Sequence, residues 1–476
     1  MQTATTRAFI DGAFIDADDT YDNLDPSTGK VLGPVARGGV AEIDRAVEAA
    51  QRANRAWRRT TAQERAELLT RFARLITDNT EVLARMESED TGKPLSQART
   101  DAGVCARYFN FYGHAIDSFY GLTIPLRPDL HAYTLREPYG VTGHIVAWNY
   151  PMQLLARGVA PAIATGNCSV VKPADETPRS AIALAELACQ AGIPAGVFNV
   201  VTGLGTEAGA ALAAHPNVAH LGFVGSTEIG KLVAKAAADR VAPVLLELGG
   251  KSAQIIFPDA DLSRAAEVVS TAILQNAGQT CSAGSRLLVH RDVHDEVVGR
   301  VADLFGKVTM GPGLADRDLG PLISLRQQAR VRGYVESLSK GEIVCGGFIP
   351  EPEGITDGAY YAPTLIDGVD PASRIAQEEV FGPVLSAMTF ADEDEAIALA
   401  NGTNYALLAA VWTKDLSRAH RLAAELEAGQ VYVNSYGAGG GVELPFGGFR
   451  GSGYGREKGY EALESFTATK TVVVQI

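Results

Sequence analysis

VTGHIVAWNYP, residues 141–151, opens a run of alternating strand-like and helix-like segments in the middle of this chain. Segments of both kinds follow it, as NCSVVKP (167–173), SAIALAELACQAG (180–192), VFNVVTG (197–203) and AHLGFVG (219–225). Strands and helices in alternation are typical of a parallel sheet with helices on both of its faces. The run therefore predicts an α/β protein with a parallel sheet at its centre.

The segments on either side extend this pattern. Residues 1–36 alternate apolar and polar side chains around tight-turn signals, which predicts short strands. Over residues 40–86 apolar side chains recur every three or four positions, which predicts helices, and Pro94 follows as a helix breaker. A second alternation of strands and helices occupies residues 250–445, and the tail TATKTVVVQI (467–476) is strand-like.

Composition and charge exclude several classes of function. The 476 residues are enough for two or three domains, and the net charge of −14 with scattered basic residues makes a nucleic-acid partner unexpected. No window approaches the roughly 18 apolar residues that cross a bilayer, and the N-terminus lacks the apolar stretch of a signal peptide. We therefore expect a cytoplasmic protein without a membrane partner. The five cysteines show no CxxC spacing, so neither a disulfide framework nor a metal site is predicted.

One cysteine lies in a setting that suits nucleophilic chemistry. QNAGQTCSAGSR, residues 275–286, surrounds Cys281 with small and polar residues, and Gly278 and Gly284 lie on either side of it. Little side-chain bulk then separates the sulfur from a substrate carbon, and glycine lets the backbone approach closely. The alternative is a buried structural cysteine, because free cysteine is among the most buried residue types.

A carboxylate upstream strengthens the nucleophile interpretation. PVLLELGGKSAQ, residues 243–254, places Glu247 in an apolar, strand-like run. Burial raises the pKa of a carboxyl group towards neutrality, which suits a general base. A buried glutamate paired with a lysine or an arginine is the alternative.

The motifs ELGGKS (247–252) and GQTC (278–281) together resemble the NAD(P)-dependent aldehyde dehydrogenase superfamily, and the similarity covers nearly the whole chain. Relatives that hand the acyl group to coenzyme A generally lack a glutamate at the position of Glu247. The resemblance therefore implies the hydrolytic branch, which oxidises an aldehyde to its carboxylic acid.

The resemblance also implies a division of the chain into three parts. These are a Rossmann-like dinucleotide-binding domain (1–118 and 138–249), an α/β catalytic domain (250–448) and a small β oligomerisation element (119–137 and 449–476) of a homodimer or homotetramer. A lone apolar strand leaves backbone donors unpaired, so we expect residues 469–476 to pair with a sheet in another subunit.

Two glycine patterns compete for the phosphates of a dinucleotide. VTGLGTEAG (201–209) is spaced GxGxxxG, one residue longer than the usual fingerprint, and is a weak signal. GFVGSTEIG (222–230) follows a strand and opens a helix, so Gly225, Ser226 and the first N–H groups of that helix would face an anion. In the superfamily this turn meets the pyrophosphate; a plain serine-capped helix is the alternative.

Lys172 and Asp175 follow a strand-like run, and the ends of parallel strands are where ribose-binding residues lie. By resemblance both hydrogen-bond the adenosine ribose. Many relatives carry glutamate where this chain has Asp175; a carboxylate repels a 2′-phosphate, which favours NAD, but the shorter side chain leaves NADP open. The resemblance adds four cofactor residues: Glu379 on the nicotinamide ribose, Phe381 beside the ring, Trp148 and Leu248. Without it, Glu379 and Phe381 would be a helix-start carboxylate and a core aromatic.

Asn149 in IVAWNYP (145–151) matches the segment that carries the oxyanion-hole asparagine of the superfamily, although a lone asparagine there is more typical of a turn. The implied mechanism has Cys281 attack the aldehyde, hydride pass to the nicotinamide, and Glu247 activate the water that hydrolyses the thioester. A catalytically silent binding or structural relative is the alternative. It would be favoured if one of these three residues were replaced, and none is.

Arg157 lies eight positions after Asn149 on a predicted helix, where the superfamily has a side chain that lines the substrate pocket. An arginine there can form a charge-assisted pair with a substrate carboxylate or phenol oxygen. The substrate is therefore expected to be a polar aldehyde, either a hydroxylated aromatic aldehyde or a semialdehyde acid, with Tyr150, Phe446 and Phe449 as apolar walls. The alternative is that Arg157 forms a structural ion pair.

Overall fold

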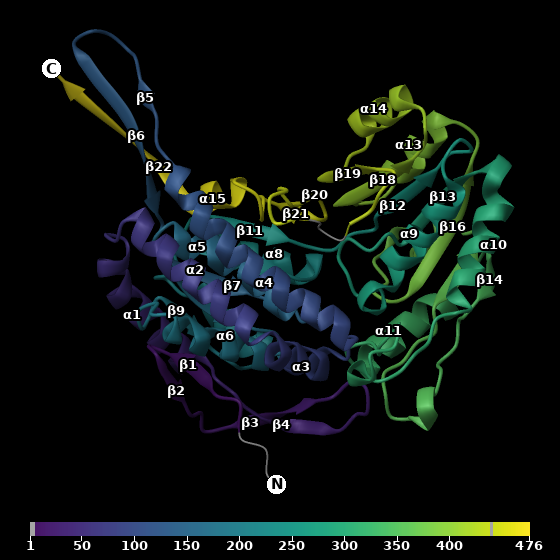
Figure 1. Cartoon of the computed structure of the whole chain (residues 1–476), viewed down its shortest axis with the longest axis horizontal. Helices are drawn as coiled ribbons and strands as arrows, with labels where there is room; N and C mark the ends of the chain where they lie inside the picture. Colours follow the sequence, from purple (N-terminus) through teal and green to yellow (C-terminus); the bar gives the residue numbers. More distant parts are fainter. Residues whose placement is uncertain (1–4, 438–440) are drawn as a thin grey trace.

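The parallel run predicted over residues 141–225 forms the middle of the larger sheet in the computed structural model, which describes residues 5–437 and 441–476. The eight strands of this sheet lie in the order β2-β1-β9-β8-β7-β10-β11-β21 (Figure 1). The central five are parallel: β7 (Val141–Ile145), β8 (Cys168–Lys172), β9 (Phe198–Val200), β10 (His220–Val224) and β11 (Val244–Glu247). The antiparallel edges are β1 (Ala8–Ile10), β2 (Ala13–Ile15) and β21 (Gly453–Tyr454). The predicted α/β class is confirmed.

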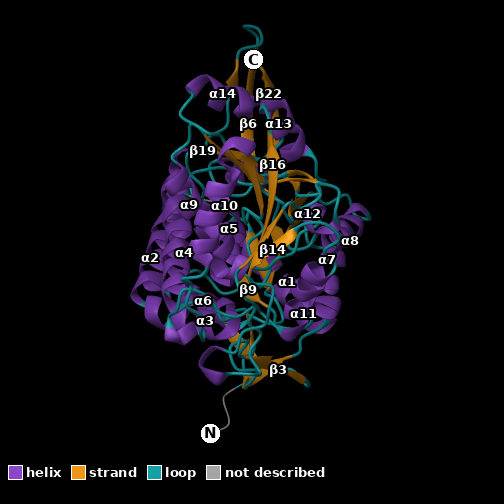
Figure 2. Cartoon of the chain, turned by 90° about the vertical axis from the view of Figure 1, so that its right-hand side faces the viewer, coloured by secondary structure: helices purple, strands orange, loops and turns teal. Residues whose placement is uncertain are grey.

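Helices cover the strands on both sides, so that the strands form the middle layer in the side view (Figure 2). The helices of this first part are α1 (Val40–Trp57), α2 (Ala62–Asp78), α3 (Thr80–Thr91), α4 (Leu95–Ala115), α5 (Pro151–Ala164), α6 (Arg179–Gln190), α7 (Ala210–Ala214) and α8 (Thr227–Ala238). The predicted helical block of residues 40–86 is thus three helices. Gly92 follows α3 in a left-handed conformation with φ of 75°, which ends a helix at little cost for glycine, and α4 begins directly after Pro94.

A second, seven-stranded sheet carries the other half of the chain, in the order β14-β15-β16-β13-β12-β18-β19. Its strands are β12 (Ala253–Ile256), β13 (Arg286–His290), β14 (Glu342–Cys345), β15 (Thr364–Asp367), β16 (Val384–Phe390), β18 (Leu408–Trp412) and β19 (Gln430–Val433). Its main helices are α9 (Leu262–Leu274), α10 (His294–Phe305), α11 (Leu325–Glu336), α13 (Glu393–Asn401) and α14 (Leu416–Glu425). Only β14 joins this sheet antiparallel among the described strands.

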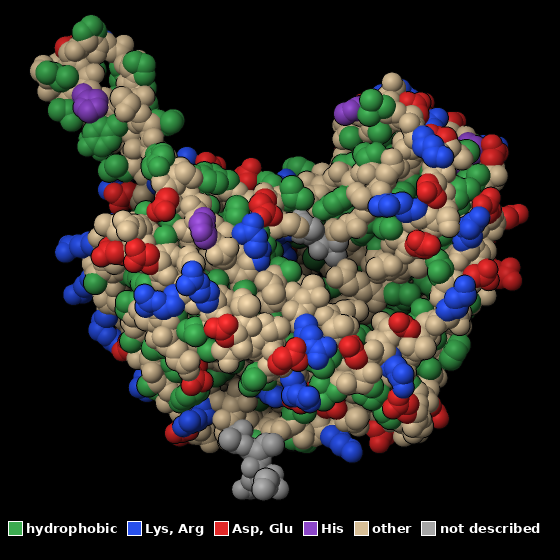
Figure 3. Space-filling view, in the orientation of Figure 1, with side chains coloured by type: hydrophobic (Ala, Val, Ile, Leu, Met, Phe, Trp, Pro, Cys, Tyr) green, Lys and Arg blue, Asp and Glu red, His purple; other side chains and the backbone are tan. Residues whose placement is uncertain are grey.

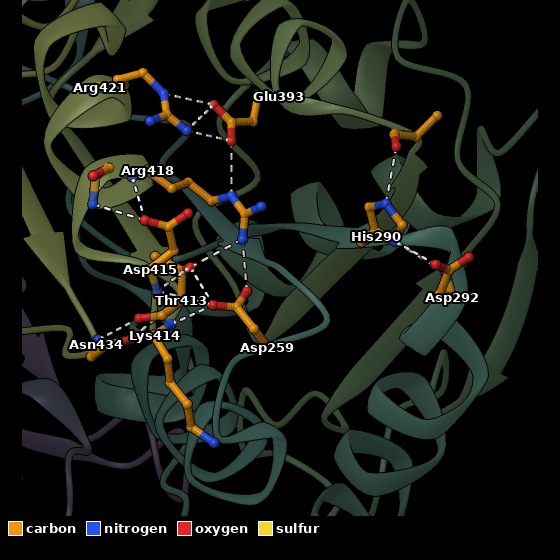
Figure 4. Close-up of polar contacts among 12 residues, drawn as sticks. Asp259, His290, Asp292, Glu393, Thr413, Lys414, Asp415, Arg418, Arg421 and Asn434 are labelled. Atoms are coloured by element: carbon orange, nitrogen blue, oxygen red, sulfur yellow. Dashed lines mark hydrogen bonds and ion pairs between the residues drawn. The ribbon is translucent and has the colours of Figure 1, made fainter.

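Asp259, in the turn between β12 and α9, fixes the start of α14 (Figure 4). Its Oδ2 accepts hydrogen bonds from Thr413 Oγ1 and from the backbone N–H of Lys414, both at 2.7 Å. Arg418 donates to Asp259 Oδ1 at 2.8 Å and to Glu393, the first residue of α13, at 2.9 Å. Asp259 thus holds the beginning of α14 directly, and Arg418 connects it to the beginning of α13.

A three-stranded arm projects from the first part of the molecule (Figure 1). It consists of β22 (Thr467–Gln475), β6 (Leu130–Pro138) and β5 (Thr123–Ile124), in that order. The tail is not a lone strand, because β22 pairs with β6 of its own chain over its full length. This nine-residue antiparallel pairing satisfies the backbone groups along one edge of β22. β22 is an edge strand of the three-stranded sheet, so the expected pairing with a sheet of another subunit stays a prediction for its other edge.

The segment after residue 449 does not all belong to this arm. β20 (Phe449–Arg450) pairs with β17 (Tyr405–Ala406), and β21 pairs with β11 in the first sheet. The chain therefore returns to both main parts before it enters the arm at Thr467, later than the boundary at residue 449 drawn from the sequence.

None of the helices in residues 5–437 and 441–476 is long and apolar enough to span a bilayer. Within the same residues, the structure contains no cluster of His, Cys, Asp and Glu side chains that could bind a metal ion.

Candidate active site

A cavity of about 590 Å³ lies between the two sheets and brings the candidate residues together. The residues that line it include Trp148, Asn149, Tyr150, Arg157, Lys172, Asp175, Gly225, Ser226, Glu247, Leu248, Cys281, Glu379, Phe381 and Phe446. Phe449 is not among them: its ring is half exposed on β20, and the guanidinium carbon of Arg456 lies 4.7 Å from the ring centroid. All the candidates except Phe449 therefore share one site.

The first sheet supplies most of this site from one edge. Asn149 follows β7, Lys172 ends β8, Ser226 follows β10 and Glu247 ends β11. These strands are parallel neighbours, so their carboxyl ends meet at the same edge, where α/β proteins bind their ligands. The second sheet contributes Cys281, which precedes β13.

The backbone before Cys281 is bent into an unusual shape. Asn276 and Ala277 both adopt left-handed conformations, with φ of 49° and 53°, and Gly278 continues with φ of 73°. A Cβ on Gly278 would collide with the carbonyl of Gly382, so glycine is required by close packing here. Strained backbone of this kind persists where the surroundings over-determine it, and here it delivers the sulfur to the cavity.

Burial keeps the thiol of Cys281 protonated in the free protein. The residue is partly exposed at the cavity, and burial together with the nearby Glu247 carboxylate raises its pKa to about 12. Thiolate is the nucleophilic form of cysteine, so reaction at neutral pH needs a base that takes this proton.

Glu247 is the carboxylate placed to act as that base. It is 1% exposed, and burial raises its pKa to about 8, although the charge of Arg157 acts in the opposite direction. Arg157 Nη2 lies 3.3 Å from Glu247 Oε2, whereas Oε1 is buried without a hydrogen-bond partner among the described residues. A carboxylate oxygen left open in this way can accept a proton from a water or a thiol in the cavity.

Asn149 links the loop after β7 to the loop that carries Cys281. Its side-chain Nδ2 donates to the carbonyl of Gln279 at 2.9 Å, and its backbone carbonyl accepts from Asn276 Nδ2 at 2.8 Å. The neighbouring Tyr150 hydroxyl lies 2.8 Å from Thr280 Oγ1. An amide carries two N–H bonds, so one remains for a substrate oxygen after Gln279 is satisfied.

Other residues that line the cavity fit a dinucleotide. Ser226 caps α8, with its Oγ accepting from Ile229 N at 3.3 Å, and the N-terminus of that helix faces the cavity as an anion site. Lys172 pairs with Asp175, whose Oδ2 also accepts from the N–H of Gly205 at 3.2 Å. Gly205 lines the cavity too, so both of the competing glycine patterns contribute to it.

Glu379 and Phe381 face the cavity from the second half of the chain. Glu379 Oε1 accepts from the N–H of Gly250 at 3.0 Å, and burial raises the pKa of this carboxyl to about 7. Phe381 is left-handed with φ of 60°, and its ring meets Trp148 edge to face at a centroid distance of 5.3 Å. Gln327 of α11 holds the Phe381 carbonyl at 2.8 Å. Sequence reasoning missed Gln327, because a polar residue on a helix carries no local sign of its target.

Arg157 has more partners than the sequence suggested. Its guanidinium forms ion pairs with Glu247 and Glu457, and its Cζ lies 4.6 Å from the centroid of the Phe446 ring. The ion pairs that a purely structural role of Arg157 would require are therefore present. Arg157 also lines the cavity, and its Nε is buried without a hydrogen-bond partner in the described part of the chain. Glu457 was missed, because it lies 300 positions further along the chain.

The chain belongs to the aldehyde dehydrogenase family, whose model it matches over residues 14–472. This confirms the resemblance drawn from ELGGKS and GQTC. A putative aldehyde dehydrogenase from Burkholderia cenocepacia is 51% identical, with a TM-score of 0.97 over 99% of this chain and 100% of that one. The P. syringae indole-3-acetaldehyde dehydrogenase AldA, in complex with NAD+ and IAA, is 41% identical, with a TM-score of 0.96 over 99% and 96% of the two chains. PnpE from Pseudomonas sp. WBC-3 is 38% identical, with a TM-score of 0.97 over 100% and 98%.

Proposed function

We propose that this protein oxidises an aldehyde to the carboxylic acid with NAD as hydride acceptor, through a thioester on Cys281. The observation that carries the proposal is that Cys281, Glu247 and Asn149 line one cavity with the residues that fit a dinucleotide. The cytoplasmic location and the division into three domains stay predictions from the sequence.

The cofactor assignment is supported by charge. Asp175 is fixed at the edge of the sheet by Lys172 and by Gly205 N, and its carboxylate would repel a 2′-phosphate at the adenosine ribose. Relatives of 41% and 38% identity have been solved with NAD+. NADP remains the alternative, since a shorter acidic side chain leaves more room than glutamate.

The residues divide the reaction between them. Glu247 takes the thiol proton, the Cys281 thiolate attacks the aldehyde carbon, and the free N–H of Asn149 stabilises the resulting oxyanion. Bound NAD would accept the hydride and so leave an acyl thioester on Cys281. Glu247 then releases the thiol proton to solvent and, with its open Oε1, removes a proton from the water that hydrolyses the thioester, which frees the acid and the Cys281 thiolate.

Replacing the nucleophile tests this function. Cys281→Ala is expected to abolish NADH formation from every aldehyde, because no covalent adduct can form, while the Kd for NAD stays within about twofold. NADH absorbance at 340 nm with a panel of aldehydes, together with NAD binding by calorimetry, measures both. A variant that keeps more than about a hundredth of the wild-type kcat would refute the covalent mechanism. A wild type inactive with every aldehyde would favour the silent relative.

The substrate is proposed to be a polar aldehyde, with a hydroxylated aromatic aldehyde favoured over a semialdehyde acid. Tyr150 and Phe446 supply aromatic walls, and the buried Nε of Arg157 offers a donor to a neutral oxygen. Arg157 already pairs with the carboxylates of Glu247 and Glu457, so a substrate carboxylate would add a third negative charge to one guanidinium. The P. syringae relative is named for indole-3-acetaldehyde, an aldehyde that carries an aromatic ring.

Matched substrates test this assignment without interference from the ion pairs. Arg157→Ala is expected to lower the ratio of kcat/KM for a hydroxybenzaldehyde over benzaldehyde by about tenfold, the scale of one lost charge-assisted hydrogen bond. Damage to Glu247 lowers both values equally and leaves the ratio alone. An unchanged ratio, with both substrates slowed, would mean that Arg157 serves only the ion pairs. The ratio for succinic semialdehyde over butanal tests the semialdehyde acid in the same assay.

A further inference from the structure

Lys93 holds a buried positive charge directly behind Asn149. It lies in the short link between α3 and α4, its side chain is 0% exposed, and it is absent from the residues that line the cavity. Its Nζ donates to Glu87 at 2.9 Å, to Asp101 at 2.5 Å and to the backbone carbonyl of Asn149 at 3.0 Å. An ammonium group has three N–H bonds, and each of them has an acceptor here.

The two carboxylates that neutralise Lys93 also hold the same loop. Glu87 Oε2 accepts from the backbone N–H of Met152 at 3.1 Å, and Asp101 Oδ1 accepts from Gln153 Nε2 at 2.6 Å. Every partner of Lys93 is thus either part of the segment 149–153 or hydrogen-bonded to it. A charged cluster is costly to bury, and an apolar cluster of the same volume would often be as stable. Stability alone therefore does not explain this cluster. Its contacts indicate that it fixes the geometry of residues 149–153.

The carbonyl of Asn149 is held from two directions. Lys93 Nζ, in the link between α3 and α4, donates to it at 3.0 Å, and Asn276 Nδ2, in the loop of Cys281, donates to it at 2.8 Å. With both lone pairs of this oxygen engaged, the peptide plane after Asn149 cannot rotate without the loss of a buried charge-assisted hydrogen bond. Lys93 Nζ also lies 4.4 Å from the centroid of the ring of the next residue, Tyr150.

We propose that Lys93 is a positioning residue for the oxyanion hole, which fixes the Asn149 peptide so that the free amide N–H faces the substrate oxygen on Cys281. This inference rests on the proposed function. Oxyanion donors act only when they are held within hydrogen-bonding distance of the developing charge, so a loosened peptide lowers the rate of adduct formation and leaves cofactor binding alone.

A double-mutant cycle tests whether Lys93 acts through Asn149. The variants are Lys93→Met, Asn149→Ala and the double variant, and the readout is the rate of NADH formation in the first turnover, by stopped flow. Lys93→Met is expected to slow this step about 30-fold and Asn149→Ala about 100-fold or more. In the double variant Lys93 has no amide left to position, so its rate should lie within about twofold of Asn149→Ala.

Alkylation of Cys281 by iodoacetamide provides a readout that needs no oxyanion hole. Substitution at a saturated carbon forms the C–S bond, expels iodide and develops no alkoxide, so Lys93→Met should be alkylated within about twofold of the wild-type rate. Asp90→Asn is the matched stability control, because Asp90 lies on α3 like Glu87 and its replacement weakens an ion pair with Arg179 of α6. It should lower Tm and keep the first-turnover rate within about twofold of wild type.

If Lys93→Met fails to fold, the triple variant Lys93→Met/Glu87→Gln/Asp101→Asn replaces it, since this variant leaves no unpaired buried charge. The same 30-fold loss is expected. A double variant about 30-fold slower than Asn149→Ala, or alkylation that falls together with the first turnover, would show that Lys93 supports the site as a whole and would overturn the inference. A wild type without NAD-dependent aldehyde oxidation would overturn the proposed function and this inference with it.

Discussion

At the scale of single residues, the pKa of Glu247 should determine how the reaction rate depends on pH. Glu247 is needed in its ionised form to activate water, and its pKa lies near 8. Its ionised fraction therefore rises as the pH rises through 8, and a reaction limited by thioester hydrolysis should accelerate over the same interval.

Glu247→Gln is expected to release about one equivalent of NADH per site in a burst and then to turn over at least 100-fold more slowly. Its slow phase should also lose the rise between pH 7 and 9 that the wild type shows. Rapid quench and stopped-flow absorbance at several pH values measure both. A variant without the burst would assign Glu247 to removal of the thiol proton, before hydride transfer.

The candidate residues that were predicted correctly as neighbours all lie in short motifs. Glu247 ends a strand, Ser226 follows one and Cys281 precedes one, each in a stretch that contains glycines, and this local pattern is visible in the sequence. Glu457 was not predicted, because its partner Arg157 lies 300 positions away in the chain. Lys93 was not predicted either, because the Asn149 carbonyl to which it donates lies 56 positions away. Only the folded chain brings such distant groups into contact, so no periodicity or motif announces these contacts.

At the scale of elements, two central strands carry buried histidines. His144 of β7 and His220 of β10 face the ring of Phe466, at centroid distances of 5.7 and 4.7 Å, and Phe466 directly precedes the arm strand β22. Burial lowers the pKa of His144 to about 3 and that of His220 to about 4. The unfolded chain binds protons at these positions near pH 6.5, so it gains protons before the folded chain does.

These two histidines therefore lower the free energy of unfolding as the pH falls from about 6.5 to 4, by up to about 1.4 kcal/mol per pH unit each. The buried carboxyls of Glu247 and Glu379, whose pKa values are raised, act in the opposite direction over the same interval. His220→Leu removes one histidine contribution, so the change of its free energy of unfolding with pH should differ from that of the wild type by up to about 1.4 kcal/mol per pH unit. Urea unfolding at pH 5, 6 and 7 measures the slope. An equal slope in His220→Leu and wild type would mean that other groups control the acid sensitivity.

The main strands and helices were predictable because they are regular over four or more residues. Residues 40–86 repeat every three to four positions, and β7 to β11 are short apolar runs between turns. β20 and β21 contain two residues each, too few for any period to appear. They were therefore assigned to the arm, although the fold uses them to tie residues 449–454 to both main sheets.

At the scale of the whole molecule, the arm projects away from the two main sheets (Figure 1). Hydrophobic side chains gather on it in the space-filling view (Figure 3), and the exposed ones include Tyr120, Leu122, Leu126, Val473, Val474 and Ile476. Apolar groups on a projecting ribbon are costly in water. We expect another copy of the chain to cover them, in the predicted homo-oligomer, and β22 as an edge strand still offers the predicted strand pairing.

Removal of residues 469–476 should therefore weaken assembly in two ways. It deletes part of the apolar surface, and it leaves the backbone of β6 unpaired along most of its length. The mass measured by sedimentation velocity should shift from a multiple of the 50.2 kDa chain mass towards the monomer at low protein concentration.

The double variant Leu122→Ser/Ile476→Ser separates the two effects, because these side chains are 66% and 81% exposed and the backbone pairing stays intact. The double variant should shift the mass in the same direction with an unchanged circular dichroism spectrum. Leu416→Ser is the matched control, because Leu416 is 72% exposed on α14, away from the arm, and its loss should leave the mass unchanged. A wild type that sediments as a monomer would show that the arm serves no homo-oligomer. A mass insensitive to both arm variants would place the subunit contact on another surface.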